Sequence, residues 1–319
     1  MTQEIDIKPL FEEAGIPLDG APGTVDVTEE MSGLEAEPKQ DWLYYGLSEF
    51  KALSQSGKKV RSAALIGSGN GIDAIALPRL FPGLEALTVT DILPEILPQI
   101  KENIERNTPV EFMPKEGVRY AAGRDCEPLE GKVDLIYGNL PLVTVDSSKL
   151  GRNLSTTTLT DSSTYARFGM GSNDVLERWS LLSQLGFLIS AKRHLNEKGI
   201  IITELGGRVP YAALAECFKR TGLDVICMRR GIKRQSDPQF LREYAEHESR
   251  IGEPFTFYDD SRVQHPSLVE IPSQLASQRD IELRKQIAPA RISAAQAYEM
   301  AIRGEPVCHI AYSFQLGKC

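Results

Sequence analysis

One short stretch decides the fold of this chain: Ala63-Ala64-Leu65-Ile66-Gly67-Ser68-Gly69-Asn70-Gly71. An apolar run ends there in three glycines at alternate positions, and Asp91 follows twenty residues beyond the last of them. Glycines permit a tight turn and a close approach of the backbone to a ligand, and a helix that starts next offers unpaired N–H groups. The pattern predicts a nucleotide-binding turn. A pyrophosphate-binding turn reads G-x-G-x-x-G, but Ile72 fills the sixth place here, which favours adenosine without a pyrophosphate.

Composition and charge narrow the functional class. The net charge of the 319 residues is −8, and the first forty residues alone account for it, so the rest of the chain is balanced. Without a basic stripe we expect a small-molecule substrate and no nucleic acid. Without a signal peptide or a long apolar run we expect a cytoplasmic protein and no membrane partner. The five cysteines are scattered and lack metal-ligand spacing, so no metal is expected.

The order of apolar and amphipathic segments predicts the architecture. From residue 61 onward, strand patterns alternate with helix patterns, which is typical of a parallel sheet covered on both faces. We expect an α/β fold, Rossmann-like and doubly wound, with a mostly parallel seven-stranded sheet in a domain spanning residues 41–319. Residues 1–40 are acidic and weakly periodic, which favours a loose arm or lid. Two further segments are too long for plain connectors: an insertion at about 231–305, read as a cap or a contact in a homo-oligomer, and residues 146–173, read as a loop that closes on substrate.

Polar side chains follow three successive predicted strands. Asp91 would accept both hydroxyls of a ribose held over the glycine turn, or else cap the next helix. Asp125 would accept the amine of an adenine, unless it is a plain loop residue. After the fourth strand, Asn139-Leu140-Pro141-Leu142 keeps the main chain extended and stiff beside the site.

Together these residues resemble the class I S-adenosylmethionine-dependent methyltransferases, which place a glycine turn, two acidic residues and an Asn-Pro-Pro-Tyr motif at successive strand ends. The resemblance implies S-adenosylmethionine as co-substrate. The implied contacts are Gly67, Ser68, Gly69, Gly71, Asp91, Ile92, Asp125, Cys126, Asn139 and Leu140. Leu140 and Leu142 replace a proline and the aromatic residue of that motif, which disfavours a planar amide nucleophile and suits an apolar one.

Two later stretches are similar to the methyltransferase domain of methionine S-methyltransferases. They are Thr203-Glu204-Leu205-Gly206-Gly207-Arg208-Val209-Pro210 and the closing His309-Ile310-Ala311-Tyr312-Ser313. The resemblance spans residues 41–316 and implies methyl transfer to the thioether sulfur of L-methionine, as in dimethylsulfoniopropionate synthesis. The alternatives are N-methylation of an amine or a protein glutamine, a nicotinamide-dependent reductase, and a cofactor-binding protein without activity.

Methylation of a thioether makes distinctive demands. The sulfur loses no proton, so no general base is needed, and catalysis depends on alignment, with Asn139 and Tyr165 as positioning candidates. Aromatic faces stabilise the sulfonium charge. Arg208 would bind the substrate carboxylate, and Glu204 or Asn139 its ammonium group. The predicted substrate-binding residues are Tyr44, Tyr45, Pro141, Tyr165, Glu204, Gly206, Arg208 and Tyr211.

Overall fold

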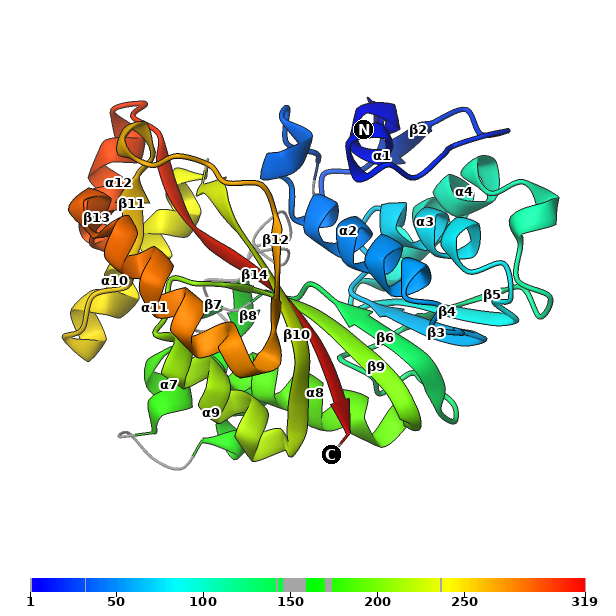
Figure 1. Ribbon diagram of the computed structural model, residues 1–319. Helices are drawn as coiled ribbons and strands as arrows, with labels where there is room; N and C mark the ends of the chain where they lie inside the picture. Colours follow the sequence, from blue (N-terminus) through cyan, green and yellow to red (C-terminus); the bar gives the residue numbers. More distant parts are fainter. Residues whose placement is uncertain are drawn as a thin grey trace.

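The computed structural model describes residues 2–31, 33–141, 143–145, 159–169, 174–235 and 237–318. Its main feature is one twisted sheet in the order β12-β10-β14-β9-β6-β3-β4-β5 (Figure 1). The strands of this path are β3 (Ser62–Ile66), β4 (Ala86–Asp91), β5 (Val118–Ala122), β6 (Val133–Gly138), β9 (Leu195–Gly206), β10 (Leu223–Gln235), β12 (Val269–Pro272) and β14 (Val307–Lys318).

Strand direction divides the sheet into two parts. Strands β5, β4, β3, β6 and β9 are mutually parallel, whereas β14 pairs antiparallel with both β9 and β10. The predicted α/β class and largely parallel sheet are confirmed. The strand number differs, because the sheet has ten strands among the described residues and not seven. The additional strands β11 (Phe257–Asp259), β12 and β13 (Arg291–Ile292) come from the segment between β10 and β14.

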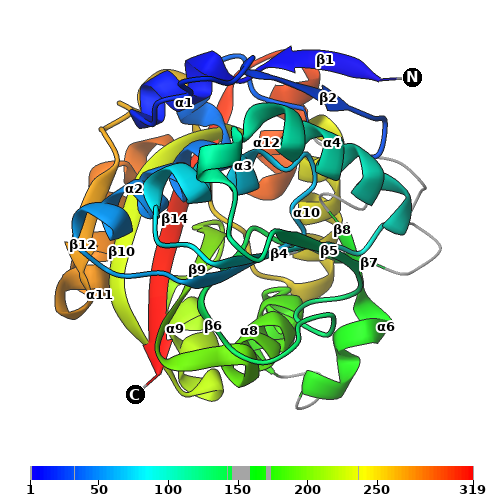
Figure 2. The same ribbon diagram turned by 90° about the vertical axis from the view of Figure 1, so that its right-hand side faces the viewer.

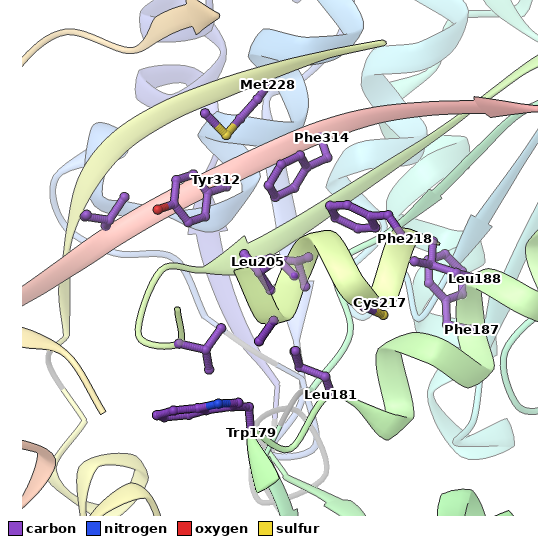
Figure 3. Packing of buried hydrophobic residues seen from close by; sticks show 14 of the residues in the cluster. Trp179, Leu181, Phe187, Leu188, Leu205, Cys217, Phe218, Met228, Tyr312 and Phe314 are labelled. Atoms are coloured by element: carbon purple, nitrogen blue, oxygen red, sulfur yellow. The ribbon is translucent and has the colours of Figure 1, made fainter. Parts of the chain in front are cut away.

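Helices cover both faces of the sheet because the buried strands are apolar on both sides. On one face lie α2 (Trp42–Gln55), α3 (Ile72–Leu80) and α4 (Leu97–Asn107), and on the other lie α8 (Leu182–His194) and α9 (Tyr211–Thr221) (Figure 1). Ala63 and Leu65 of β3 belong to the core under α2 to α4, and the alternate residues Ala64 and Ile66 to the opposite core. Figure 3 shows that second core, where aromatic rings from α9 and β14 pack together. The ring centres of Phe218 and Phe314 lie 4.8 Å apart.

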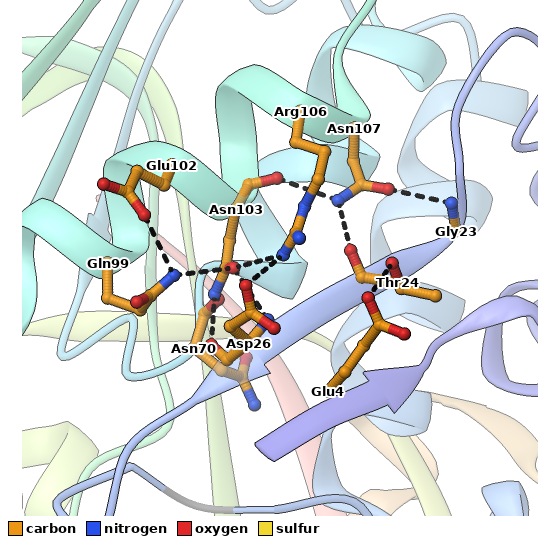
Figure 4. A network of polar contacts seen from close by, with 10 residues as sticks. All are labelled: Glu4, Gly23, Thr24, Asp26, Asn70, Gln99, Glu102, Asn103, Arg106 and Asn107. Carbon is orange, nitrogen blue, oxygen red and sulfur yellow. Dashed lines mark hydrogen bonds and ion pairs between the residues drawn. The ribbon is translucent and has the colours of Figure 1, made fainter. Parts of the chain in front are cut away.

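The N-terminal segment is part of the packed fold. It forms β1 (Gln3–Asp6), α1 (Lys8–Ala14) and β2 (Thr24–Val27), and its apolar residues, among them Ile7 and Phe11, are buried in the core beside α2 and α4 (Figure 2). The Asn103 amide on α4 donates both to the Asp26 carbonyl at 2.8 Å and to the Asn70 carbonyl at 3.0 Å (Figure 4). A loose arm is therefore the wrong description of this segment. Its acidic residues are on the surface, while its sparse apolar residues are enough to anchor it.

The segment that follows β10 contributes α10 (Pro238–Ile251), α11 (Ala276–Gln286) and α12 (Ala294–Ile302) besides the three short strands. Strand β10 runs to Gln235, opposite Val307 of β14, so both strands extend past the carboxyl end of β9. The short elements β7 (Val143–Val145), β8 (Leu159–Asp161), α6 (Ser162–Tyr165) and α7 (Val175–Arg178) precede α8. Most of the predicted closing loop at 146–173 lies outside the described residues, as does Leu142. Among the helices described, none is long and apolar enough to cross a membrane.

Candidate functional site

A cavity of about 610 Å³ lies at the carboxyl ends of the parallel strands. Open α/β sheets bind ligands at this edge. Thirteen of the predicted site residues line it: Gly67, Ser68, Gly69, Asp91, Ile92, Asp125, Asn139, Leu140, Pro141, Tyr165, Glu204, Gly206 and Arg208. Since neighbouring strands are about 4.8 Å apart, the ends of β4 and β9 lie about 14 Å apart across β3 and β6. The cavity therefore has two ends, which we call the β4 end and the β9 end.

The glycine turn leads from β3 into α3. Gly67, Gly69 and Gly71 have φ angles of 67°, 57° and 80°, in the left-handed region that favours glycine. A Cβ on Gly67 would lie only 2.7 Å from Leu140, so the turn also needs glycine for space. Gly71 is the residue that begins α3, and its added Cβ would face Ile100 of α4. Gly71 thus shapes the turn without lining the cavity.

Asp91 ends β4 and is held by the backbone of two loops. One of its carboxylate oxygens accepts from Gly69 N at 3.1 Å and the other from Leu93 N at 3.1 Å. A carboxylate has about four acceptor sites, and the backbone N–H of Ile92 also interacts with this one, so acceptor capacity remains for a ligand. Burial raises the pKa of Asp91, and the backbone N–H groups oppose this shift. The arrangement fixes a carboxylate beside the glycine turn, where a ligand diol would find two acceptors.

Asp125 follows β5 and pairs with Tyr165. Its φ of 49° is unusual for a residue other than glycine, and the Tyr165 hydroxyl donates to its carboxylate at 3.0 Å. Burial raises the pKa of Asp125 to about 6. Arg124 lies over the Tyr165 ring, 5.8 Å from its centre. Tyr165 is therefore a support for Asp125 at the β4 end of the cavity.

The segment Asn139 to Pro141 leaves the end of β6, midway between the two ends of the cavity. Ser183 of α8 donates to the Pro141 carbonyl at 3.3 Å, and Thr203 of β9 donates to the Gly138 carbonyl at 3.1 Å. These bonds fix the main chain on both sides of Asn139.

Glu204 is a buried carboxyl group on β9, and only 2% of the residue is exposed. The Tyr137 hydroxyl donates to its Oε1 at 3.1 Å, while Oε2 has no hydrogen-bond partner among the described residues. Burial raises the pKa of Glu204 well above its usual value, and the nearby carboxylate of Asp41 adds to the shift. The shift favours the neutral form of Glu204, and a cation beside the group would favour its carboxylate.

Arg208 is a buried cation at the same end of the cavity. Its guanidinium folds back over Gly206, where any Cβ would overlap it, and it lies 4.9 Å from the ring centres of both Phe240 and Tyr244. Its Nη1 donates to Gln235 Oε1 at 3.1 Å and lies 3.2 Å from Nε2 of His309.

No carboxylate pairs with Arg208 in the part of the chain that the structure describes, and its Nε has no partner there. Burial lowers the pKa of Arg208, although an arginine keeps its charge. His309 is neutral because burial and the Arg208 charge lower its pKa. A buried charge of this kind requires a compensating anion.

Several residues at the β9 end, among them Asp41 and Tyr137, were not predicted from the sequence, and four others come from elements far apart in the chain. Lys233 and Gln235 belong to the extended part of β10, Phe240 to α10 and Trp42 to the start of α2. Lys233 is 4% exposed, its Nζ lies 3.6 Å from a Glu35 carboxylate oxygen, and burial lowers its pKa. The signal in the sequence was the pair of basic residues Lys233-Arg234 that follows the apolar start of β10.

Four other predicted residues lie outside this cavity: Cys126, Tyr44, Tyr45 and Tyr211. Cys126 is fully buried in the core under α8, because the turn after Asp125 directs it inward. Tyr45 packs against Trp42 and Tyr44, and its hydroxyl approaches Gly231. The Tyr211 ring packs edge to face with the Tyr312 ring and lines a different cavity. The residues that replace these tyrosines beside the β9 end are Trp42 and Phe240.

One cluster of described residues has the composition of a metal site. Ligand atoms of Asp260, His265 and Cys308 lie within 4.8 Å of one another, away from the cavity. Asp260 already accepts from Arg234 Nε at 2.9 Å and contacts His265 at 2.5 Å, and these two partners lower its pKa to about 2. The cluster is a satisfied polar network that joins β10 to the start of β14.

No protein-family model matches the sequence, and no curated protein matches it. Similar solved structures include the ribosomal protein L11 methylase from Lactobacillus delbrueckii subsp. bulgaricus, with 18% identity over 56% of this chain and 70% of that one and a TM-score of 0.35. They also include precorrin-6y C5,15-methyltransferase from Geobacter metallireducens (11% identity, 89% and 92% coverage, TM-score 0.36). A third is the N-methyltransferase NodS from Bradyrhizobium japonicum, with 14% identity over 57% of this chain and 82% of that one and a TM-score of 0.35. The case for an activity of this chain rests on the cavity itself.

Proposed function

We propose that the protein transfers the methyl group of S-adenosylmethionine to the thioether sulfur of L-methionine, giving S-methylmethionine and S-adenosylhomocysteine. The observation that carries the proposal is the pair of unmatched buried groups at the β9 end. Among the residues that the structure describes, Arg208 is a cation with no carboxylate partner, and Glu204 is an acid with one unpartnered oxygen. An amino acid supplies the complement of each, a carboxylate for Arg208 and an ammonium group for Glu204.

The β4 end fits the adenosyl part of the co-substrate. The lone pairs left on Asp91 are placed for the two ribose hydroxyls beside the glycine turn, and Asp125 offers a carboxylate to the exocyclic amine of adenine. The left-handed glycines let the turn approach the nucleoside closely, since no side chain projects from Gly67 or Gly69. The methyl donor would then point across Asn139 towards the β9 end.

Methyl transfer to a thioether needs alignment and little else. A sulfur lone pair forms the new bond to the methyl carbon while the bond from that carbon to the sulfonium sulfur breaks, and no proton leaves. The neutral state of His309 suits this chemistry, because the reaction requires no general base. Holding the two sulfurs in line can supply up to about 7–11 kcal/mol of the barrier reduction. Trp42 and Phe240 give the reacting groups an aromatic surrounding.

The test is mass spectrometry of the products after incubation with S-adenosylmethionine labelled in its methyl group. The panel contains methionine, its decarboxylated analogue, its 2-hydroxy analogue, simple amines and a glutamine-containing peptide. We expect a labelled sulfonium from methionine. Label on nitrogen would instead identify an N-methyltransferase, and no transfer despite binding of the co-substrate would indicate a protein without this activity.

A further inference from the structure

A second cavity, of about 730 Å³, lies between α9, α11 and the segment that follows α10. Tyr211, Pro210 and Trp179 form part of its wall, and Arg284 of α11 lines it together with Asp280. This cavity shares no lining residue with the first one. The second cavity matters because Arg284, which lines it, also binds the loop that carries Arg208.

Arg284 binds the backbone on both sides of Arg208. Its Nη2 donates to the Gly207 carbonyl at 2.9 Å and to the Val209 carbonyl at 3.0 Å. Its Nε donates to Asp280 at 2.8 Å, and Asp280 in turn accepts from the Tyr312 hydroxyl. These partners raise the pKa of Arg284, so it stays charged under all ordinary conditions.

The loop that carries Arg208 depends on such external contacts. It contains Gly206 and Gly207, which restrict the backbone little, and β9 ends at Gly206. Two main-chain hydrogen bonds also join the loop to distant segments: Gly207 N donates to the Ile310 carbonyl at 2.6 Å, and Thr256 N donates to the Arg208 carbonyl at 2.8 Å. Among the described side chains that bind this loop, only Arg284 donates to two of its carbonyl groups, and those two belong to the residues before and after Arg208.

We propose that Arg284 is a positioning residue for substrate binding: by holding the Gly207 and Val209 carbonyls from the second cavity, it keeps the Arg208 guanidinium over Gly206 in the first. This inference rests on the proposed function, because it takes Arg208 as the group that binds the substrate carboxylate. Arg284 itself touches neither the co-substrate nor methionine. Its loss would therefore weaken methionine binding and leave the β4 end intact.

The first experiment compares Arg284→Ala with Arg279→Ala, a matched control on the same helix whose exposed side chain pairs with Glu282. We expect Arg284→Ala to raise the KM for methionine about tenfold or more, as loss of a well-placed charged hydrogen bond would. The Kd for S-adenosylmethionine should not change. Arg279→Ala should change neither constant, and Arg284→Lys should fall between, since one ammonium group cannot replace the guanidinium fork.

The second experiment uses the second cavity itself. Truncation of Arg284 leaves a space of guanidinium shape that is reached from that cavity, so added methylguanidinium should restore a low KM for methionine in Arg284→Ala and have no effect on the control. An unchanged KM in Arg284→Ala would overturn the inference. A second result would also overturn it. In that result Arg284→Ala weakens the binding of both methionine and the co-substrate, and neither methylguanidinium nor the Arg284→Lys variant restores it. The role of Arg284 would then be structural. Failure of the proposed function has a different signature, the absence of methionine turnover in the unmodified protein, and the inference would fall with it.

Discussion

Replacement of Arg208 by methionine separates substrate recognition from the rest of the site. The Arg208→Met side chain keeps an unbranched apolar stem that can pack against Phe240 and Tyr244, but it removes the charge and the donors. If Arg208 binds the carboxylate of methionine, the loss will appear with methionine and be absent with its decarboxylated analogue. The comparison of two substrates therefore measures one interaction.

The size of the effect follows from the surroundings of Arg208. The residue is 4% exposed, so little solvent screens its charge, and a charge-assisted hydrogen bond there is worth about 1.5–3 kcal/mol. That range corresponds to a loss of about 10- to 150-fold in kcat/KM for methionine. For the decarboxylated analogue we expect kcat/KM to change less than about threefold, since the thioether and the amine keep their partners.

The assay is the initial rate of S-adenosylhomocysteine formation over a series of concentrations of each substrate. Calorimetric titration with S-adenosylhomocysteine shows in parallel that the β4 end of the Arg208→Met variant is intact. An equal fall in kcat/KM for the two substrates, with the β4 end intact, would refute the assignment of Arg208 to the carboxylate. Gln235 and His309 lose a partner in this variant, and the resulting loss of stability is read separately from its urea unfolding curve.

Three titratable groups give further predictions. The pKa of Asp125 is about 6, so the affinity for S-adenosylmethionine should fall as the pH drops below 6. The Tyr165→Phe variant loses a hydrogen bond that lowers this pKa. In calorimetric titrations it should therefore show the same fall in affinity at a higher pH. The pKa of Asp73, buried beside the glycine turn, is raised to about 7, so its stabilising contribution is complete below about pH 4 and is lost as pH rises through 7. Between pH 5 and 7 the free energy of unfolding of the unmodified protein, measured with urea, should accordingly fall by about 1.4 kcal/mol per pH unit. The Asp73→Asn variant should not show this fall. The ammonium group of methionine would ionise Glu204, so methionine binding should release a proton. The release would appear as a binding enthalpy that depends on the ionisation enthalpy of the buffer. The Glu204→Gln variant should not show that dependence.

The parallel half of the fold and the β4 end of the cavity could be predicted from the sequence because both follow local rules. Gly67, Asp91 and Asp125 each stand where one strand ends, and strand ends can be recognised from apolar runs. The β9 end follows no such rule. Trp42 reaches it from the first turn of α2, and Lys233 reaches it because β10 continues beyond the length of its apolar run.

The position of the predicted tyrosines outside this cavity has the same origin. Tyr44 and Tyr45 follow Trp42 by two and three residues, and the Tyr45 ring packs beside Trp42 with its hydroxyl near Gly231 of β10, so only Trp42 of the three lines the cavity. Tyr211 follows the Gly206 to Pro210 loop closely, yet α9 carries it to the opposite side of that loop. Proximity in sequence to a residue that lines the cavity therefore does not place a side chain in the cavity.

The charges of the two ends explain how one cavity can orient two similar molecules. S-adenosylmethionine and methionine both carry an amino-acid group and a sulfur atom, so shape alone distinguishes them poorly near the centre. The β4 end holds the carboxyl groups of Asp91 and Asp125. The β9 end holds the buried cation Arg208, which has no carboxylate partner among the described residues, and Lys233, whose charge faces Glu35 and Asp41. A nucleoside, rich in hydrogen-bond donors, is favoured beside Asp91 and Asp125, and a free carboxylate is favoured beside Arg208. Orientation of both substrates then follows from electrostatics, and orientation is the main requirement of a reaction that moves a methyl group and no proton.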